Sequence, residues 1–111
     1  MATDEDTLFK ALADASRRQL LDRLRKKSGL TLGDLCTGHA MSRQAVTKHL
    51  ALLEAANLVV TVKRGREKLH YLNPAPIQEI SARWIGKFER ERLQALTTLK
   101  QALNPKGEDH D

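Results

Sequence analysis

Four side chains within one short segment have the hydrogen-bonding groups that recognise DNA bases: Arg43, Gln44, Thr47 and Lys48. Arginine can donate two hydrogen bonds to guanine, glutamine pairs bidentately with adenine, and lysine bonds guanine or a phosphate. Threonine reaches a base edge or the methyl group of thymine. On one face of a helix, these side chains could recognise a base sequence in the major groove.

The residues around these side chains predict such a helix. Ser42 is a good N-cap, because its hydroxyl can accept a hydrogen bond from an amide of the first turn. Val46, Leu50 and Leu53 then form one apolar stripe that faces a core, so the polar side chains point outward. His49 lies beside this stripe, and we expect it to pack there or to contact a phosphate. An ordinary amphipathic helix would show the same pattern, so the neighbouring elements must decide.

The segment before this helix predicts a shorter one. Thr31 followed three residues later by Asp34 resembles a capping box, and a helix is expected over residues 32–37. Residues 38–41 then turn the chain into the polar helix. Two helices joined by such a turn, the second with outward polar residues, form a helix-turn-helix in which the first helix braces the second.

The residues after the polar helix predict a β-hairpin. Asn57 is expected to end the helix in a left-handed conformation. Residues 58–62 are rich in β-branched side chains, and residues 68–72 alternate with period two. The connection over residues 63–67 is a basic turn around glycine. Four basic side chains of this wing are expected to contact phosphates or enter an adjacent minor groove: Lys63, Arg64, Arg66 and Lys68.

Apolar residues at both ends of the chain predict a dimer. Helices are expected over residues 4–13, capped by Thr3 or Asp4, over residues 16–27, capped by Asp14, and over residues 77–103. A small domain cannot cover the last helix, so we expect it to pack with the first helix against the same elements of a second chain. The expected interface residues are Leu8, Phe9, Leu12, Trp84, Phe88, Leu96 and Leu99.

The predicted fold is mainly α, with five helices and a β-hairpin wing between the fourth and the fifth. This winged helix-turn-helix is expected to form a single DNA-binding and dimerisation domain over residues 1–103. Residues 104–111 are expected to be disordered. In the second helix, four arginines are expected to be mostly exposed: Arg17, Arg18, Arg23 and Arg25.

The composition favours double-stranded DNA as the partner. The 111-residue chain has a net charge of +5, and the positive excess lies in residues 15–27 and 42–73. Only 4% of the residues are aromatic, whereas single strands and RNA loops are commonly bound by stacking on aromatic rings. The chain shows no long apolar run and no leader-like N-terminus, so a cytoplasmic protein without membrane contact is expected.

The order of these motifs resembles the ArsR/SmtB family of bacterial winged helix-turn-helix regulators. The resemblance rests on residues 8–14, Arg17-Arg18, residues 32–35, residues 42–58, and Gly65-Arg66 with Tyr71. It implies a homodimer that binds operators with inverted repeats and represses transcription until an effector weakens binding. The positions that it implies for DNA contact are Ser42, Arg43, Gln44, Thr47, Lys48 and His49, with Arg66 in the wing.

The effector is the least determined part of this resemblance. Many relatives sense metals through a Cys-x-Cys pair in the bracing helix or through Asp and His ligands in the last helix. Here the bracing helix has only Cys36, and residues 77–103 contain neither Asp nor His. Residues 84–89 also resemble a non-metal subgroup. We therefore expect no metal site and no cofactor, and release from DNA by an unidentified non-metal signal.

Several alternatives remain open. A metal site could be assembled across the two subunits of a dimer. Cys36 could be a redox-sensing thiol, or a small buried side chain. A winged-helix module that binds proteins would be expected to lack the basic face. An enzyme would have to use Cys36 and His39 as nucleophile and base, and no orienting group accompanies them, so no enzyme is expected.

Overall fold

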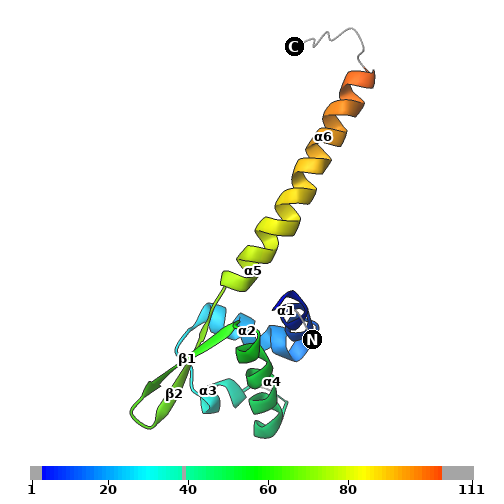
Figure 1. Ribbon diagram of the computed structural model, residues 1–111. Helices are drawn as coiled ribbons and strands as arrows, with labels where there is room; N and C mark the ends of the chain where they lie inside the picture. The colour runs from blue at the N-terminus through cyan, green and yellow to red at the C-terminus, as the bar shows by residue number, and fades with distance from the viewer. Residues whose placement is uncertain (1–3, 39, 104–111) are drawn as a thin grey trace. The chain divides into compact units, whose positions relative to one another are not determined.

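The computed structural model describes residues 4–38 and 40–103 and shows a mainly helical winged helix-turn-helix, as predicted (Figure 1). The chain divides into two compact units, Met1–Ile77 and Gln78–Asp111, and the single domain expected over residues 1–103 stays a prediction. Thr3 and the tail expected to be disordered lie outside the described residues.

The elements are α1 (Asp4–Leu12), α2 (Ala15–Lys26), α3 (Leu32–Cys36), α4 (Arg43–Ala55), β1 (Val59–Arg64), β2 (Glu67–Leu72), α5 (Ala75–Ile80), the π-helical segment η1 (Ser81–Ile85) and α6 (Gly86–Leu103).

The N-termini of α2, α3 and α4 are capped as predicted. The carboxylate of Asp14 accepts a hydrogen bond from the backbone amide of Arg17 at 3.1 Å. The hydroxyl of Ser42 accepts one from the amide of Ala45 at 3.1 Å. Thr31 and Asp34 form the reciprocal capping box, with both hydrogen bonds present. These caps satisfy first-turn amides that have no partner inside their helices, so the helix starts are defined locally.

The connection from α4 to the hairpin also follows the prediction, whereas the turn of the hairpin is shorter. Asn57 takes φ +60°, and the amide of Leu58 donates to the carbonyl of Leu53 at 2.9 Å, a common helix ending. The five-residue turn predicted over residues 63–67 is wrong, because Arg64 still pairs with Glu67. Gly65 takes φ +62°, a conformation that closes a hairpin in two residues.

The core of the N-terminal unit lies between α1–α4 and the base of the hairpin. The segment before α3 joins this core through a bridge to β2, in which the amide of His70 donates to the carbonyl of Leu30 at 2.8 Å. This bridge holds the N-terminal end of α3 beside the wing. The core residues are Leu8, Ala11, Leu20, Leu21, Leu24, Leu30, Leu35, Val46, Leu50, Leu53, Ala56, Leu58 and Val59.

Two of the four α2 arginines are half-buried rather than mostly exposed. Arg23 donates hydrogen bonds of 2.8 Å to the carbonyls of Asp34, Leu35 and Thr37. Arg17 donates to two carbonyls at the C-terminal end of α1, at 2.8 and 3.0 Å. Carbonyls at a helix end have no partner within the helix, so an arginine nearby is drawn against them.

The C-terminal unit, Gln78–Asp111, is helical throughout its described residues. The helix predicted over residues 77–103 begins earlier, at Ala75, and is π-helical at Ser81–Ile85. Proline tolerates the first turn of a helix, where its missing amide is not needed, so Pro76 does not delay the start. Four side chains predicted for a dimer interface are exposed here: Trp84, Phe88, Leu96 and Leu99.

The α1 residues predicted for the same interface differ in solvent exposure. Leu8 is only 3% exposed, whereas Phe9 is 49% exposed, and Leu12 is half-buried. Leu8 is therefore packed in the core of its own chain, and its contribution to a dimer interface stays a prediction. The helical period places residues 8 and 9 on different faces of α1.

Candidate nucleic-acid interface

The outward face of α4, with its N-cap Ser42, carries half of the predicted DNA-contacting residues. Ser42, Arg43, Gln44, Thr47 and Lys48 are all exposed, because Val46, Leu50 and Leu53 point the opposite face into the core. The last four of these polar residues line one surface hollow of about 450 Å³. The hydroxyl of Thr47 donates to the carbonyl of Arg43 at 2.9 Å. This face therefore presents a compact set of donors and acceptors of the kind that bond base edges.

The wing adds exposed positive charge next to α4. Lys63, Arg64, Arg66 and Lys68 are all exposed. Lys63 pairs directly with Lys68 across the hairpin, and directly opposed residues share one face of a sheet. Arg64 lies on the other face because successive side chains of a strand alternate, and Arg66 lies in the turn. The four predicted wing residues therefore belong to three positions of the hairpin rather than to one face.

The family of the chain follows from comparison with known proteins. The model of the "Helix-turn-helix domain" family matches residues 12–62. The chain is 37% identical to a helix-turn-helix transcriptional regulator of Bacillus subtilis, YuzN, over 77% of this chain and 99% of that protein. It is 32% identical to the arsenical resistance operon repressor of Escherichia coli, over 91% of this chain and 88% of that protein. An ArsR-like regulator from Rhodococcus sp. RHA1 superposes with a TM-score of 0.72 and 32% identity, covering 89% and 92% of the two chains.

The chain belongs to the ArsR family of transcriptional regulators. This ArsR-family protein is therefore a DNA-binding transcriptional regulator, and α3, α4 and the hairpin form its winged helix-turn-helix. The family is one of transcriptional regulators and not of enzymes. The alternative in which Cys36 and His39 act as the nucleophile and base of an enzyme is therefore not supported. Across residues 4–38 and 40–103, no helix of this ArsR-family protein is both long and apolar enough to cross a membrane.

One predicted DNA-contacting residue of this ArsR-family protein faces its own core elements. His49 is half-buried, and its Nδ1 lies 3.2 Å from a guanidinium nitrogen of Arg17. A guanidinium only donates hydrogen bonds, so Nδ1 acts as the acceptor. The same guanidinium donates to α1, and it therefore connects α1, α2 and the recognition helix. The apolar spacing in the sequence placed His49 beside the core but could not identify this partner.

The side chains considered for effector binding lie apart. Cys36 is a free, half-buried thiol at the last residue of α3. His39 and His110 fall outside the described residues, whereas His70 is buried in β2. Within the part of the chain that the structure describes, no three His, Cys, Asp or Glu side chains group as a metal ion would require.

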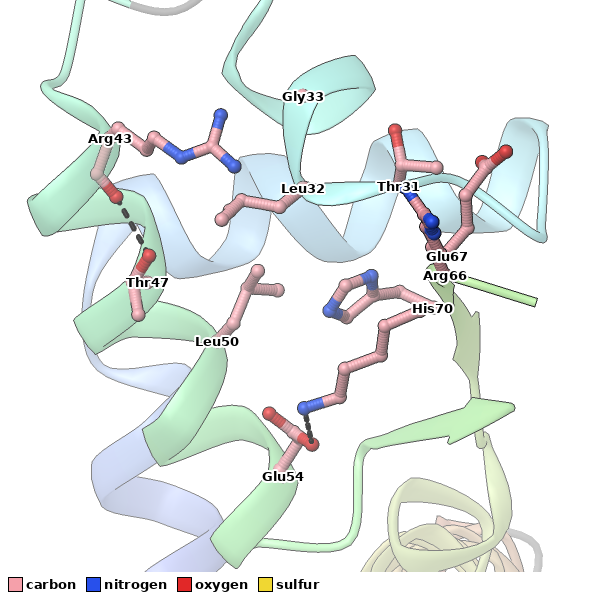
Figure 2. A pocket seen from close by; sticks show the side chains of 11 residues that line it. Thr31, Leu32, Gly33, Arg43, Thr47, Leu50, Glu54, Arg66, Glu67 and His70 are labelled. Carbon is pink, nitrogen blue, oxygen red and sulfur yellow. Dashed lines mark hydrogen bonds and ion pairs between the residues drawn. The ribbon is translucent and has the colours of Figure 1, made fainter. Parts of the chain in front are cut away.

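Sequence reasoning missed a contact between the recognition helix and the wing of this ArsR-family regulator. The ammonium nitrogen of Lys68 lies 3.5 Å from a carboxylate oxygen of Glu54, at the C-terminal end of α4 (Figure 2). Glu54 is 14 residues from Lys68 in the chain, and no local pattern links them. Lys68 is thus already paired within the protein, unlike the other three basic residues of the wing, for which the described residues show no ion pair.

Proposed function

We propose that this ArsR-family regulator is a homodimeric repressor of its own operon that a non-metal signal releases from DNA. The observation that supports this proposal best is the capped helix α4, which exposes a row of base-recognising side chains beside a basic hairpin. A related protein of similar length is the arsenical resistance operon repressor of Escherichia coli. Repression by occupation of an operator is the simplest use of such a surface.

In this proposal the exposed residues have two different roles. Arg43, Gln44, Thr47 and Lys48 contact base edges in the major groove, and Ser42 holds the start of α4 against the DNA backbone. Arg66 contacts phosphates or enters the minor groove from the wing. His49 supports the helix from its inner side. Lys63 and Arg64 add positive charge in the wing, whereas Lys68, which is paired with Glu54, adds little net charge there.

The dimer places two recognition helices at two half-sites. Symmetric dimers of helix-turn-helix proteins contact half-sites one helical turn apart, or a small multiple of it. The apolar side chains proposed for the contact are the exposed Phe9 and the half-buried Leu12 in α1, with the exposed Trp84, Phe88, Leu96 and Leu99 in the C-terminal unit. A single chain would bind one half-site weakly.

The signal is proposed to be a non-metal one on chemical grounds. Soft thiolate and imidazole ligands, three or four together, are what a closed zinc site uses. In this chain α3 offers one thiol and the last helix offers neither Asp nor His. Cys36 alone would sense oxidants rather than metals, and a thiol probe that reacts with Cys36 in the native protein would favour that alternative.

In the test, the protein is titrated into labelled DNA from the region upstream of its own gene. Fluorescence anisotropy monitors the binding, and random duplex DNA serves as the competitor. The wild type is expected to saturate at two chains per site and to survive competition. Gln44→Ala removes a base contact, so discrimination between specific and random DNA should fall by about tenfold. Arg66→Ala removes a phosphate contact, so binding should weaken on all sequences. The slope of the logarithm of the binding constant against the logarithm of the salt concentration should decrease by about one.

The control for charge loss is Arg25→Ala, because Arg25 is an exposed base on α2 that forms a loose surface ion pair with Asp22 at 3.9 Å. This variant is expected to bind operator DNA like the wild type. Equal losses of specific and random binding in the Gln44 and Arg66 variants would contradict the two roles. Wild-type binding no tighter than to random duplex would contradict repression at this site.

A further inference from the structure

A cleft in the N-terminal unit lies between the start of α3, the side of α4 and the wing strand β2. Its volume is about 500 Å³, which is within the range of small-molecule sites. Leu32 and Leu50 are among the side chains that line it, and Figure 2 shows the side chain of Arg43 above Leu32 in this view. The paired Glu54 and Lys68 lie on another side of the cleft.

His70 is the feature that points to a ligand. It is the buried polar residue of the described core, with 3% of its surface exposed, and Figure 2 shows its ring directed into the cleft. The ring is fixed by its Nδ1, which lies 2.9 Å from the carbonyl oxygen of Leu30. A carbonyl oxygen only accepts, so Nδ1 must hold a proton and donate.

The other ring nitrogen, Nε2, is then a hydrogen-bond acceptor in the neutral ring. In residues 4–38 and 40–103 no donor meets it. A buried acceptor without a partner costs free energy, and native proteins satisfy most such groups. A bound molecule with an O–H or N–H group directed at Nε2 would supply the missing donor.

The charged side chains around the cleft indicate which other group the ligand carries. The guanidinium groups of Arg43 and Arg66 and the carboxylate of Glu67 form no ion pair with any described residue, whereas Lys68 is neutralised by Glu54. The lining therefore keeps a positive excess, and Arg43 lies on a different element from Glu67. An anionic group would therefore bind at Arg43, for which a carboxylate has the matching bidentate geometry. Between this anion and the donor at His70, the apolar side chains of Leu32 and Leu50 suit an apolar body such as an aromatic ring.

We propose that this cleft binds a small aromatic acid that has a hydroxyl or amino donor, and that the bound acid excludes operator DNA. The exclusion rests on the proposed function, because Arg43, Thr47 and Arg66 line the cleft and are the residues proposed to contact DNA. The effector and the operator then compete for the same side chains. No conformational change between distant sites is required.

The DNA backbone does not satisfy the same chemistry. A phosphodiester is ionised at neutral pH and has no hydrogen to donate, so it leaves the Nε2 of a neutral His70 without a partner. A phosphate could still bond Arg43 or Arg66 at the rim of the cleft. The buried nitrogen therefore distinguishes a small-molecule site from a simple extension of the DNA surface.

The experiment follows the His70 ring nitrogens by NMR in the wild-type protein, labelled with ¹⁵N-histidine and free of DNA. The probes are 4-hydroxybenzoate, 4-aminobenzoate and benzoate. The first two are expected to shift the Nε2 signal and to saturate. Benzoate keeps the anion and the ring but lacks the donor, so it should bind more weakly by up to about tenfold, the range for one hydrogen bond.

Two substitutions form a matched pair. In His70→Asn the side-chain amide can replace Nδ1 at Leu30 but reaches no further, so the preference for 4-hydroxybenzoate over benzoate should disappear. In His70→Gln the longer amide keeps a polar group near the position of Nε2, so part of the preference should remain. If His70→Asn does not fold, the wild-type comparison of the three probes decides the question alone.

Operator DNA is then titrated with and without 4-hydroxybenzoate. Displacement of bound DNA at the probe concentration that shifts His70 is the expected result. A failure of the protein to bind its operator would count against the proposed repressor, while the NMR titration would still test the cleft. The cleft proposal is overturned if none of the probes shifts His70, or if benzoate binds as tightly as the other two.

Discussion

Two carboxylates at helix N-termini make the folded state sensitive to acid. The hydrogen bond from the backbone amide of Arg17 lowers the pKa of Asp14 below its ordinary value. The backbone amide and then the hydroxyl of Thr31 lower the pKa of Asp34 in the same way. At these two positions the unfolded chain therefore takes up protons at a higher pH than the folded chain does.

The sign of the pH dependence follows from this difference. A lowered pKa stabilises the fold above the ordinary carboxyl value of about 4, and this stabilisation is lost as the pH falls through the folded-state pKa. Asparagine caps a helix about as well as the N-cap aspartate Asp14 does, and at position 34 its side-chain oxygen can accept the hydrogen bond from the amide of Thr31. Asparagine does not titrate. The variants Asp14→Asn and Asp34→Asn should thus lose less thermal stability than the wild type between about pH 5 and pH 3. Circular dichroism melting curves at each pH measure this, and identical losses would contradict the assignment.

At the scale of elements, α3 is held to α2 by one arginine. Arg23 donates to three carbonyls at and beyond the end of α3, and the planar guanidinium fits several acceptors at once where an ammonium does not. Arg23→Lys keeps the charge but should lower the free energy of unfolding by about 1–2 kcal/mol. Urea unfolding followed by circular dichroism measures the change.

The matched control is Arg25→Lys on the same helix. Arg25 is exposed, and its contact with Asp22 at 3.9 Å is a surface pair, which typically contributes little. We expect a change within about 0.5 kcal/mol. If both arginines tolerate lysine equally, the hydrogen bonds of Arg23 to α3 do not determine the stability of the helix-turn-helix.

The same elements show which features a sequence can predict. The caps at Asp14, Thr31 and Ser42 and the left-handed Asn57 were predicted because each depends on residues within three or four positions. The partners of Arg17 and the ring contact of His70 were not, because His49 is 32 residues from Arg17 and Leu30 is 40 residues from His70. The hairpin turn was predicted too long because its basic residues resemble a loop, whereas backbone pairing continues to Arg64 and Glu67.

At the scale of the whole molecule, an exposed apolar row along the C-terminal unit has to be covered. Trp84 and Phe88 lie with their ring centres 6.1 Å apart, and Phe88 is 59% exposed. Leu96 and Leu99 continue the row at helical spacing. Contiguous apolar surface of this kind marks interaction sites in monomeric structures, and the proposed function assigns it to a second copy of the chain.

Phe88→Asp tests this assignment. A carboxylate in an apolar interface would have to be desolvated without a partner, so the variant is expected to sediment as a single chain where the wild type sediments as two. The core of the N-terminal unit lies in other residues, and its urea transition should remain. Loss of the link between two recognition helices should weaken operator binding by about 10²-fold or more, because the second half-site is then no longer bound intramolecularly.

The control is Gln94→Asp, which makes the same change in net charge on the same helix. Gln94 is exposed and lies six residues from Phe88, which the helical period places off the apolar row. This variant should remain a dimer with wild-type affinity for DNA. A Phe88→Asp protein that still sediments as two chains would exclude the row as the dimer contact. If it became a single chain and kept full operator affinity, the two-half-site model of binding would be wrong, while the dimer contact itself would stand.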